Sequence, residues 1–373
     1  LPNKVFLSGY DPPDRAKLLK TYIKKYQQVF GTKPKMAGAW YIDARSQNFL
    51  AEVGIKALLV VADQYDTDAL ASWGKYWQMP FYPSKYNSLE PAGTQNLKIP
   101  IVNIQWAQRH PTLGYGKEIK YSRQSFQAND YINNGFDSAY FDNLLDIYIN
   151  QQKTDFIQIT LGLETGQEAR AFFQEFNYQL DQIKNLKNQG ELKTVTASEF
   201  SDWYHNTYPG ISPSHYFFHQ DSFWYMSPKF RVFITKDGQE FKLKDLRYYQ
   251  GIPNKDYFYA DNNAFLDRKV PPQVEGLNHN VINLGDLSNS RLVENFDRLT
   301  IKSDNKVIQV NTKGVVIDDK AILSMKGNKF NDHSIKFRYI TFLEVFKNLA
   351  KPLLSPVKFS SIENQTMLGV AIK

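Results

Sequence analysis

The sequence predicts an α/β domain built around a parallel sheet, followed by a β-rich domain. Between residues 12 and 205, apolar runs with the length of buried strands alternate with segments whose apolar residues recur at helical spacing. Near residue 210 this alternation stops, and short runs of strand character follow. We place the boundary so that the two domains cover residues 1–212 and 213–373.

The elements of the first domain follow one another in a regular order. Residues 12–30 show helical spacing, with prolines at the start and Gly31 at the end. The run 55–62 is almost continuously apolar, which is typical of a strand buried on both faces of a parallel sheet. The remaining expected elements are strands 36–42, 99–106, 156–163 and 193–196 and helices 44–53, 137–150, 166–187 and 198–205.

The second domain is predicted from short alternating segments separated by turns. Residues 222–235 and 239–249 flank the turn 236–238, and this pattern predicts a β-hairpin. Further short runs suggest an antiparallel sandwich; they are 297–302, 306–310, 314–318 and 335–342.

Composition excludes several classes of protein. The chain of 373 residues has no cysteine, so it has no disulfide, thiolate metal site or cysteine nucleophile. Its net charge of +7 is spread along the chain without a nucleic-acid-binding motif, and no nucleic-acid partner is expected. No apolar run is long enough to cross a membrane. Aromatic residues make up 15%, and aromatic rings suit the flat C–H faces of sugars as well as a large core.

Acidic residues follow three of the expected strands, at the end where ligands bind in parallel β/α folds. Paired carboxylates in one site can act as acid and base, or as acid and nucleophile, on a glycosidic bond. We therefore predict a catalytic set drawn from Glu164, Asp43, Asp63 and Asp68.

Aromatic and amide residues accompany these acids. They stand at strand ends and in the long aromatic segment 73–92, which has no periodic pattern. The predicted substrate-binding residues are Trp40, Gln64, Trp73, Trp77, Tyr82, Lys85, Gln105 and Trp106.

Each of these candidates also has a structural interpretation. Asp43 and Glu164 each precede an expected helix and can cap it or stabilise its first turn. The acids between residues 63 and 68 can form an Asx turn, and the segment 73–92 can be a packed loop. His215 and His219 have the i, i+4 spacing of a metal site on a helix, but no Glu lies between them, and we predict no metal ligands.

Residues 3–250 resemble a bacterial family in the glycoside hydrolase/polysaccharide deacetylase superfamily of β/α barrels. The resemblance covers about two-thirds of the chain. It is carried by KVFLSGYDPPDR (4–15), FGTKPKMAGAWYIDA (30–44), ADQYDTDALASWGKYW (62–77), YPSKYN (82–87), IQWAQRHPTLGYG (104–116), LGLE (161–164), VTASEFSDWY (195–204), WYMSPKFR (224–231) and DLRYY (245–249). It implies a β/α barrel that acts on carbohydrate, followed by the β-rich domain, and a carbohydrate or polysaccharide partner.

The chain corresponds to the deacetylase pattern at three segments and departs from it at two of them. The GAWYID segment (38–43) stands where a deacetylase has Arg-Pro-Pro-Tyr, and ADQYDTD (62–68) stands at the following aspartate motif. LGLE (161–164) replaces the closing Leu-x-His-Asp. By this comparison, the Asp-Asp and His-x-x-x-His motifs that bind a divalent metal would precede Leu1, so the residues present imply no cofactor.

Because the chain begins with Leu1, we interpret it as a segment whose barrel starts further upstream. Related proteins commonly begin with a signal segment or membrane anchor. We therefore expect an extracellular or outward-facing, membrane-anchored protein, in contact with a membrane only through such an anchor.

Three functional hypotheses follow. The first is a glycoside hydrolase-like enzyme in which Glu164 pairs with Asp43 or with an acid of 63–68. The second is a glycan-binding module without catalysis. The third is a metal-dependent polysaccharide deacetylase whose ligands come from upstream of residue 1.

Overall fold

The computed structural model of the chain describes most, but not all, of its residues. The described residues are 7, 10–39, 42–60, 79–105, 108–113, 125–151, 154, 156–163, 166–249, 274–275, 281–287, 289–295, 297–326, 329–332 and 370–372.

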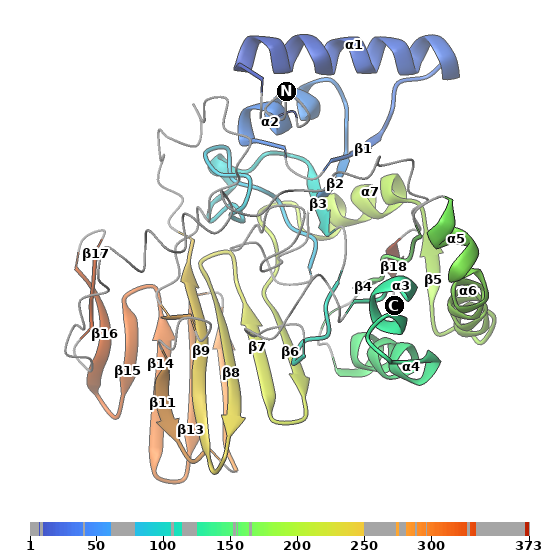
Figure 1. Ribbon diagram of the computed structural model, residues 1–373. Coiled ribbons are helices and arrows are strands. Elements are labelled where there is room, and N and C mark those ends of the chain that lie inside the picture. The colour runs from blue at the N-terminus through green and yellow to red at the C-terminus, as the bar shows by residue number, and fades with distance from the viewer. Residues whose placement is uncertain are drawn as a thin grey trace, which may run out of the picture.

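The first part of the chain alternates helices with short strands (Figure 1). Its strands are β1 Met36–Gly38, β2 Ala57–Val60, β3 Val102–Gln105, β4 Phe156–Gln158 and β5 Lys193–Val195. Its helices are α1 Pro12–Phe30, α2 Ala44–Glu52, α3 Ala128–Ile132, α4 Ser138–Asp146, α5 Gln167–Ala171, α6 Phe173–Asn188 and α7 Ala197–Thr207, with a 3₁₀ turn η3 Gln95–Leu97 and a π turn η4 Ile147–Gln151.

Strands β1, β2 and β3 form a parallel sheet in that order, as the sequence predicted. Side chains of β2 alternate between two cores. Leu58 and Val60 join Ile23 and Leu50 in a helix-side core under α1 and α2. The other β2 side chains enter the main core, so the strand is buried on both faces. Burying one such leucine stabilises the fold by about 1.5–3 kcal/mol.

Strands β4 and β5 belong to a second small sheet. Strand β18, Val370–Ile372, lies between them and runs antiparallel to both. Helix α7, which follows β5, begins with a capping box in which Thr196 and Glu199 exchange side-chain to backbone hydrogen bonds. It packs near β2 through a hydrogen bond from Ser201 Oγ to Lys56 O of 2.7 Å.

The described residues of the second part of the chain form two antiparallel sheets, each with six strands. The first sheet contains β6 His215–His219, β7 Ser222–Met226, β8 Phe230–Asp237, β9 Glu240–Tyr248, β10 Val274–Glu275 and β11 Ile282–Gly285. The second is a meander of β12 Arg291–Asn295, β13 Arg298–Ser303, β14 Lys306–Asn311, β15 Gly314–Ile317, β16 Lys320–Lys326 and β17 Lys329–Asp332.

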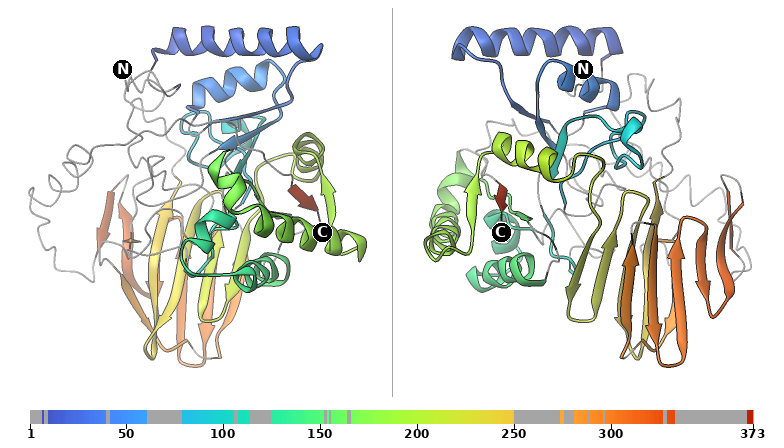
Figure 2. Two further views of the ribbon diagram at one scale, coloured as in Figure 1. Left: turned by 45° about the vertical axis from the view of Figure 1, so that its right-hand side comes forward. Right: turned by 180° about the vertical axis from the view of Figure 1, so that it is seen from behind.

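A shared apolar core joins these two sheets face to face. Val232 and Leu246 of the first sheet and Ile301 and Ile308 of the second belong to this sandwich core. The opposite face of the first sheet contributes to the main core, in which Trp224 packs with side chains of β3 and β4. Figures 1 and 2 show the sandwich at one end of the molecule and α1 with α2 at the other.

Two sequence predictions were wrong in detail. The expected single strand 222–235 is two strands, because the chain turns at residues 227–229 and Ser227 Oγ accepts hydrogen bonds from the backbone N–H groups of Lys229 and Phe230. The expected helix 166–187 is broken at Phe172, which packs against the main core. The run 335–342 lies outside the described residues.

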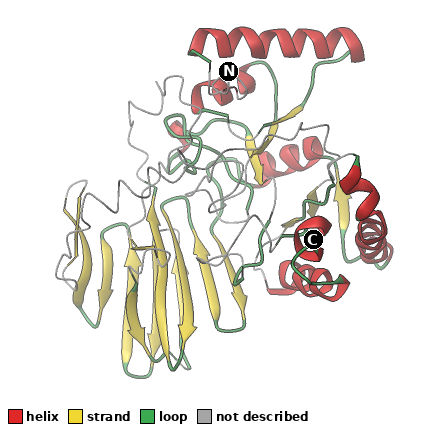
Figure 3. Cartoon of the chain, viewed as in Figure 1, coloured by secondary structure: helices red, strands yellow, loops and turns green. Residues whose placement is uncertain are grey.

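The architecture is mixed α/β, with one parallel sheet and larger antiparallel sheets (Figure 3). The parallel strands form an open sheet in the described part of the chain, where no closed barrel is seen. Among the described residues no helix has the length and apolar character needed to cross a membrane. The main core contains residues from both sides of residue 212, and the division into two domains stays a prediction.

Candidate functional site

The candidate site lies where the parallel strands end. Since β1, β2 and β3 are parallel, the segments that follow them start from the same edge of the sheet. Four predicted site residues are described by the structure; they are Asp43, Tyr82, Lys85 and Gln105. The others lie outside the described residues, and their roles stay predictions; they are Glu164, Asp63, Asp68, Trp40, Gln64, Trp73, Trp77 and Trp106.

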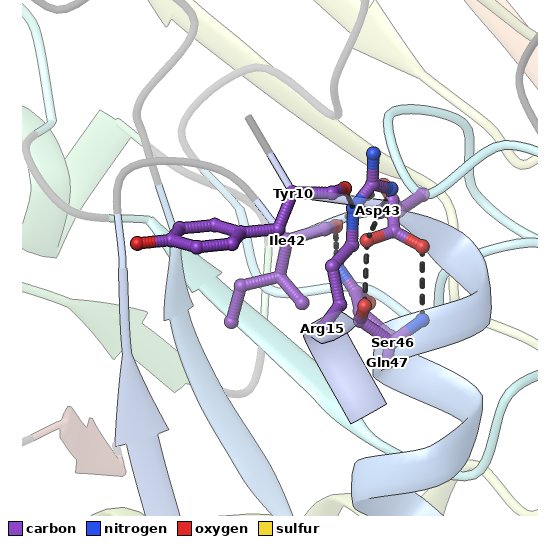
Figure 4. A network of polar contacts seen from close by, with 7 residues as sticks. Tyr10, Arg15, Ile42, Asp43, Ser46 and Gln47 are labelled. Atoms are coloured by element: carbon purple, nitrogen blue, oxygen red, sulfur yellow. Dashed lines mark hydrogen bonds and ion pairs between the residues drawn. The ribbon is translucent and has the colours of Figure 1, made fainter. Parts of the chain in front are cut away.

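Asp43 caps helix α2 and joins it to α1 (Figure 4). Its Oδ1 accepts a hydrogen bond of 3.0 Å from Ser46 N, and its Oδ2 accepts one of 2.6 Å from Ser46 Oγ. Arg15 Nη1 lies 3.2 Å from the same Oδ2, and both side chains are almost fully buried. The Arg15 Nε also donates to Tyr10 O at 2.6 Å, which holds the guanidinium in place.

This network uses both oxygens of the Asp43 carboxylate. A catalytic role would require the carboxylate to leave the helix cap and a buried ion pair, and removing one partner of such a pair is costly. The local geometry therefore accounts for Asp43 as a structural residue. Its predicted catalytic role has no support from these contacts and remains a prediction.

Gln158 joins strand β4 to the end of strand β3 through its side-chain amide. Its Oε1 accepts from Gln105 N at 3.2 Å, and its Nε2 donates to Gln105 O at 2.6 Å and to Thr160 Oγ1 at 3.1 Å. The hydroxyl of Thr160 donates to the same Gln105 carbonyl at 3.1 Å. The amide thus satisfies backbone groups of β3 as a neighbouring strand would, although β3 and β4 belong to different sheets.

Gln108 lies at the same edge and is fully buried. Its Oε1 accepts a hydrogen bond of 3.0 Å from Thr160 N. Its Nε2 has no hydrogen-bond partner among the described residues, and the same is true of Asn103 Oδ1 and Thr112 Oγ1. Leaving a buried polar atom without a partner costs about 1–3 kcal/mol, so such atoms call for an explanation.

Arg109, the residue after Gln108, forms an ion pair that was not predicted from the sequence. Arg109 Nη1 lies 3.6 Å from Asp130 Oδ2, which also accepts a hydrogen bond of 2.6 Å from Ser125 Oγ. Tyr148 Oη donates to Arg109 O at 2.9 Å. The signal was the polar run Gln-Arg-His directly after an apolar strand, but its acidic partner lies 21 residues further along the chain (Asp130 against Arg109).

His110 connects the α/β part to the first antiparallel sheet. Its Nδ1 accepts hydrogen bonds from the backbone N–H groups of Thr112 and Leu113 at 3.2 and 3.1 Å. The ring proton therefore sits on Nε2 when the ring is neutral. The ring meets His219 of β6 edge-on at 5.1 Å and stacks on Tyr140 of α4 at 6.1 Å.

Tyr140 places a further hydroxyl beside this segment. Burial raises the pKa of Tyr140, and the carboxylate of Asp130 raises it too, whereas Arg109 lowers it. The hydroxyl is therefore protonated at neutral pH and can both donate and accept. Its oxygen has no hydrogen-bond partner in the described structure.

The buried histidines make stability depend on pH. Burial lowers the pKa of His110 to about 3, helped by the nearby His219, and burial alone lowers that of His215 to about 3. A histidine in the unfolded chain has a pKa of about 6.5. Above about pH 6.5 neither histidine makes the free energy of unfolding depend on pH. Between pH 6.5 and 3 the unfolded chain binds a proton at each histidine and the folded chain does not, so the free energy of unfolding falls.

We expect each of these histidines to lower the free energy of unfolding by about 2 kcal/mol between pH 6.5 and pH 5. Denaturant unfolding at both pH values measures this loss. In His110→Asn the amide oxygen can still accept from Thr112 N. The loss of unfolding free energy between pH 6.5 and pH 5 should be smaller in this variant by the contribution of His110. An equal loss in this variant and the wild type would show that His110 is not the responsible group.

Tyr82 and Lys85 lie in an ordered loop that covers the sheet. Tyr82 is fully buried, its ring contacts Tyr204 edge-on at 5.0 Å, and the Lys98 ammonium lies 4.4 Å from its centre. Lys85 is exposed, and its backbone N–H donates to Leu97 O. A substrate-binding role for either residue stays a prediction, since the contacts of Tyr82 account for it as part of the core.

His215 and His219 are four residues apart on a strand, so their Cα atoms are about 13 Å apart. Each ring contacts a different part of the protein, His215 against Phe156 and His219 against His110. Among the described residues no group of three His, Asp or Glu side chains is placed to hold a metal ion.

Comparison with known proteins adds one likeness of fold. No protein-family model matches the sequence, and no curated protein matches it. A solved structure from Parabacteroides distasonis, described as a "putative glycoside hydrolase/deacetylase", superposes with a TM-score of 0.50 at 15% identity. The superposition covers 64% of this chain and 62% of that one. At this identity the likeness is one of fold.

Proposed function

We propose that this chain is a carbohydrate-active protein of the glycoside hydrolase/deacetylase barrel type, which binds a polysaccharide at the carboxyl ends of its parallel strands. The Parabacteroides distasonis protein supports this proposal at the level of the fold, since it shares the fold and is described as a "putative glycoside hydrolase/deacetylase". The observation that carries it is a set of buried polar atoms without partners on strand β3, on the segment that follows it and on helix α4. They comprise an amide oxygen, an amide N–H₂ group and two hydroxyls; the residues are Asn103, Gln108, Thr112 and Tyr140.

A polyhydroxylated ligand suits this set, because each sugar hydroxyl both donates and accepts a hydrogen bond. Amide and hydroxyl side chains can satisfy such groups without a net charge. A neutral polysaccharide is therefore a better match than an anionic ligand, which would be expected to contact lysine or arginine side chains.

We propose Glu164 as the leading catalytic carboxylate. It follows residues 159–163, which are largely buried and come directly after β4, and it lies four residues beyond the Thr160 that contacts Gln108. A second acid would come from Asp63 or Asp68, since the Asp43 carboxylate is already used by Ser46 and Arg15. Two carboxyl groups about 5–9 Å apart would support hydrolysis of a glycosidic bond.

A panel of soluble oligosaccharides from cellulose, chitin and xylan tests the proposal. Calorimetry would measure binding, and reducing-end sugar and free acetate would be quantified with and without an added divalent metal. Binding of one class with release of reducing ends would support the hydrolase. Release of acetate only with metal would support the deacetylase instead. No binding of any carbohydrate would contradict the proposal.

Glycan binding without catalysis is the second candidate function, and the Asp43 network favours it. One of the four predicted acids has a full set of structural contacts, which leaves fewer acids for chemistry. This candidate predicts binding that weakens in Trp73→Ala or Trp77→Ala, with no product from any sugar in the panel. Because the proposed partner is a polysaccharide, we also propose that the protein acts outside the cell.

A further inference from the structure

The side-chain amide of Gln108 has a defined orientation. Only its oxygen can accept the hydrogen bond from Thr160 N, because a backbone N–H requires an acceptor. The N–H₂ group must therefore point away from Thr160. Unlike many amide side chains, this one cannot be turned over without losing a buried hydrogen bond.

The N–H₂ group has no acceptor in the described structure, although Gln108 is fully buried. A leucine or methionine would fill similar space without burying an amide donor, but it would take away the acceptor of Thr160 N. Buried polar groups that lack a partner are uncommon, and a ligand or a water molecule usually explains them. The position of Gln108, just beyond the end of a parallel strand, is where ligands bind in such folds.

Other buried polar atoms without partners lie on the same stretch of chain as Gln108 or on a side chain packed against it. Asn103 Oδ1 and Thr112 Oγ1, from the same stretch of chain, also lack partners among the described residues. Tyr140 Oη, whose ring stacks on His110 from the same segment, lacks one too. A fixed donor, an acceptor and two hydroxyls are the kinds of group that hydrogen-bond sugar hydroxyls.

We propose that Gln108 is a substrate-binding residue whose Nε2 donates a hydrogen bond to a hydroxyl oxygen of a neutral sugar. Thr160 sets the direction of this donor through its backbone N–H. The donor would select sugars that carry an oxygen at this position against deoxy analogues that lack it. This inference rests on the proposed carbohydrate function and identifies a specificity-determining residue within it.

Two variants test the donor. Gln108→Met removes it and should weaken binding of the oligosaccharide that the wild type binds in the cellulose, chitin and xylan panel by about 10- to 100-fold. Gln108→Glu keeps an acceptor for Thr160 N but has no donor when ionised. Its affinity should recover as pH falls, because the protonated carboxyl group donates again. A purely structural role would not produce this recovery.

Gln179 provides the matched control. It is also fully buried, but it lies on α6 and its Nε2 donates to Phe126 O at 2.7 Å and to Tyr131 Oη at 2.9 Å. Gln179→Met should lower stability and leave affinity within about 2-fold of the wild type, a difference well under 1.4 kcal/mol.

The outcomes separate the inference from the function on which it rests. If the wild type binds no sugar of the panel, the proposed function fails and the inference fails with it. If the wild type binds and Gln108→Met binds equally well, only the inference is overturned, and a buried water is the partner of Nε2. If Gln108→Met does not fold, Gln108→Glu decides: an affinity ratio to wild type that is independent of pH overturns the inference.

Discussion

Replacing Asp245 with asparagine should lower the free energy of unfolding by about 3–5 kcal/mol, because it removes the carboxylate shared by two buried arginines. Asp245 Oδ1 lies 2.7 Å from Arg231 Nε, and Asp245 Oδ2 lies 3.1 Å from Arg231 Nη2 and 3.3 Å from Arg247 Nε. All three side chains are fully buried. Denaturant unfolding followed by tryptophan fluorescence measures the loss.

The position of this cluster explains the size of the expected effect. Arg231 and Arg247 stand opposite each other on strands β8 and β9, on the face of the sheet that Phe233 contributes to the main core. Two like charges directly opposite on one sheet are unfavourable unless an anion lies between them. The Arg231 guanidinium also lies 5.6 Å from the ring of Trp224, so its displacement would disturb the packing there.

Asp237→Asn is the matched control, because Asp237 lies on the same pair of strands. Its ion pair with Lys242 is 2.8 Å long, but about half of the Asp237 side chain is exposed. Exposed ion pairs contribute little, so this variant should unfold close to the wild type. Equal stability of Asp245→Asn and Asp237→Asn would contradict the assigned role of the buried carboxylate.

Glu164→Gln should reduce turnover of the bound polysaccharide by about 10²- to 10⁴-fold, because the amide can neither supply nor take up a proton. Binding of the same sugar should persist, since the side chain keeps its size and its hydrogen-bonding capacity. The initial rate of reducing-end release at saturating substrate, together with calorimetric affinity, separates these effects.

Glu168→Gln is a suitable control, because Glu168 follows Glu164 by four residues in the first turn of α5. It should leave turnover unchanged. Asp43→Asn should lower stability through the loss of the Arg15 ion pair, with turnover of the folded protein near that of the wild type. If Asp43→Asn stops turnover in a folded protein and Glu164→Gln does not, Asp43 and not Glu164 is the catalytic carboxylate.

The sequence predicted the parallel sheet well because two of its strands, β2 and β3, are buried on both faces. In β2 every residue is buried, so the apolar run 55–62 had no helical alternative of suitable length. Helix α1 was predicted over its full length, since Gly31 adopts the left-handed conformation that ends it, with φ of 72°. Local chemistry was sufficient in both cases.

Elements that depend on distant contacts were predicted less well. Phe172 interrupts a segment with good helical spacing because its ring packs on the main core, and spacing alone does not reveal this packing. The turn at 227–229 depends on the Ser227 hydroxyl and on Pro228, which lacks the N–H that a continuous strand would use.

The candidate site was only partly accessible to sequence reasoning. Gln105 was predicted because it lies at the end of an apolar strand, but Gln158 lies inside the expected strand 156–163 and has no such marker. The structure shows that its amide hydrogen-bonds the Gln105 backbone. Asp43 was predicted as a catalytic candidate, and the structure shows that it caps helix α2. An aspartate that caps a helix and a catalytic aspartate have the same sequence context.

The amide bridge from Gln158 to Gln105 has a consequence for motion. A regular ladder opens only when consecutive backbone hydrogen bonds break together, whereas this seam depends on side chains that can rotate. Strands β3 and β4 can therefore separate transiently while each stays paired within its own sheet. Amide hydrogen exchange at Gln105 N should be faster than in the paired interior of β2, and Gln105 lies at the edge where we propose that a polysaccharide binds.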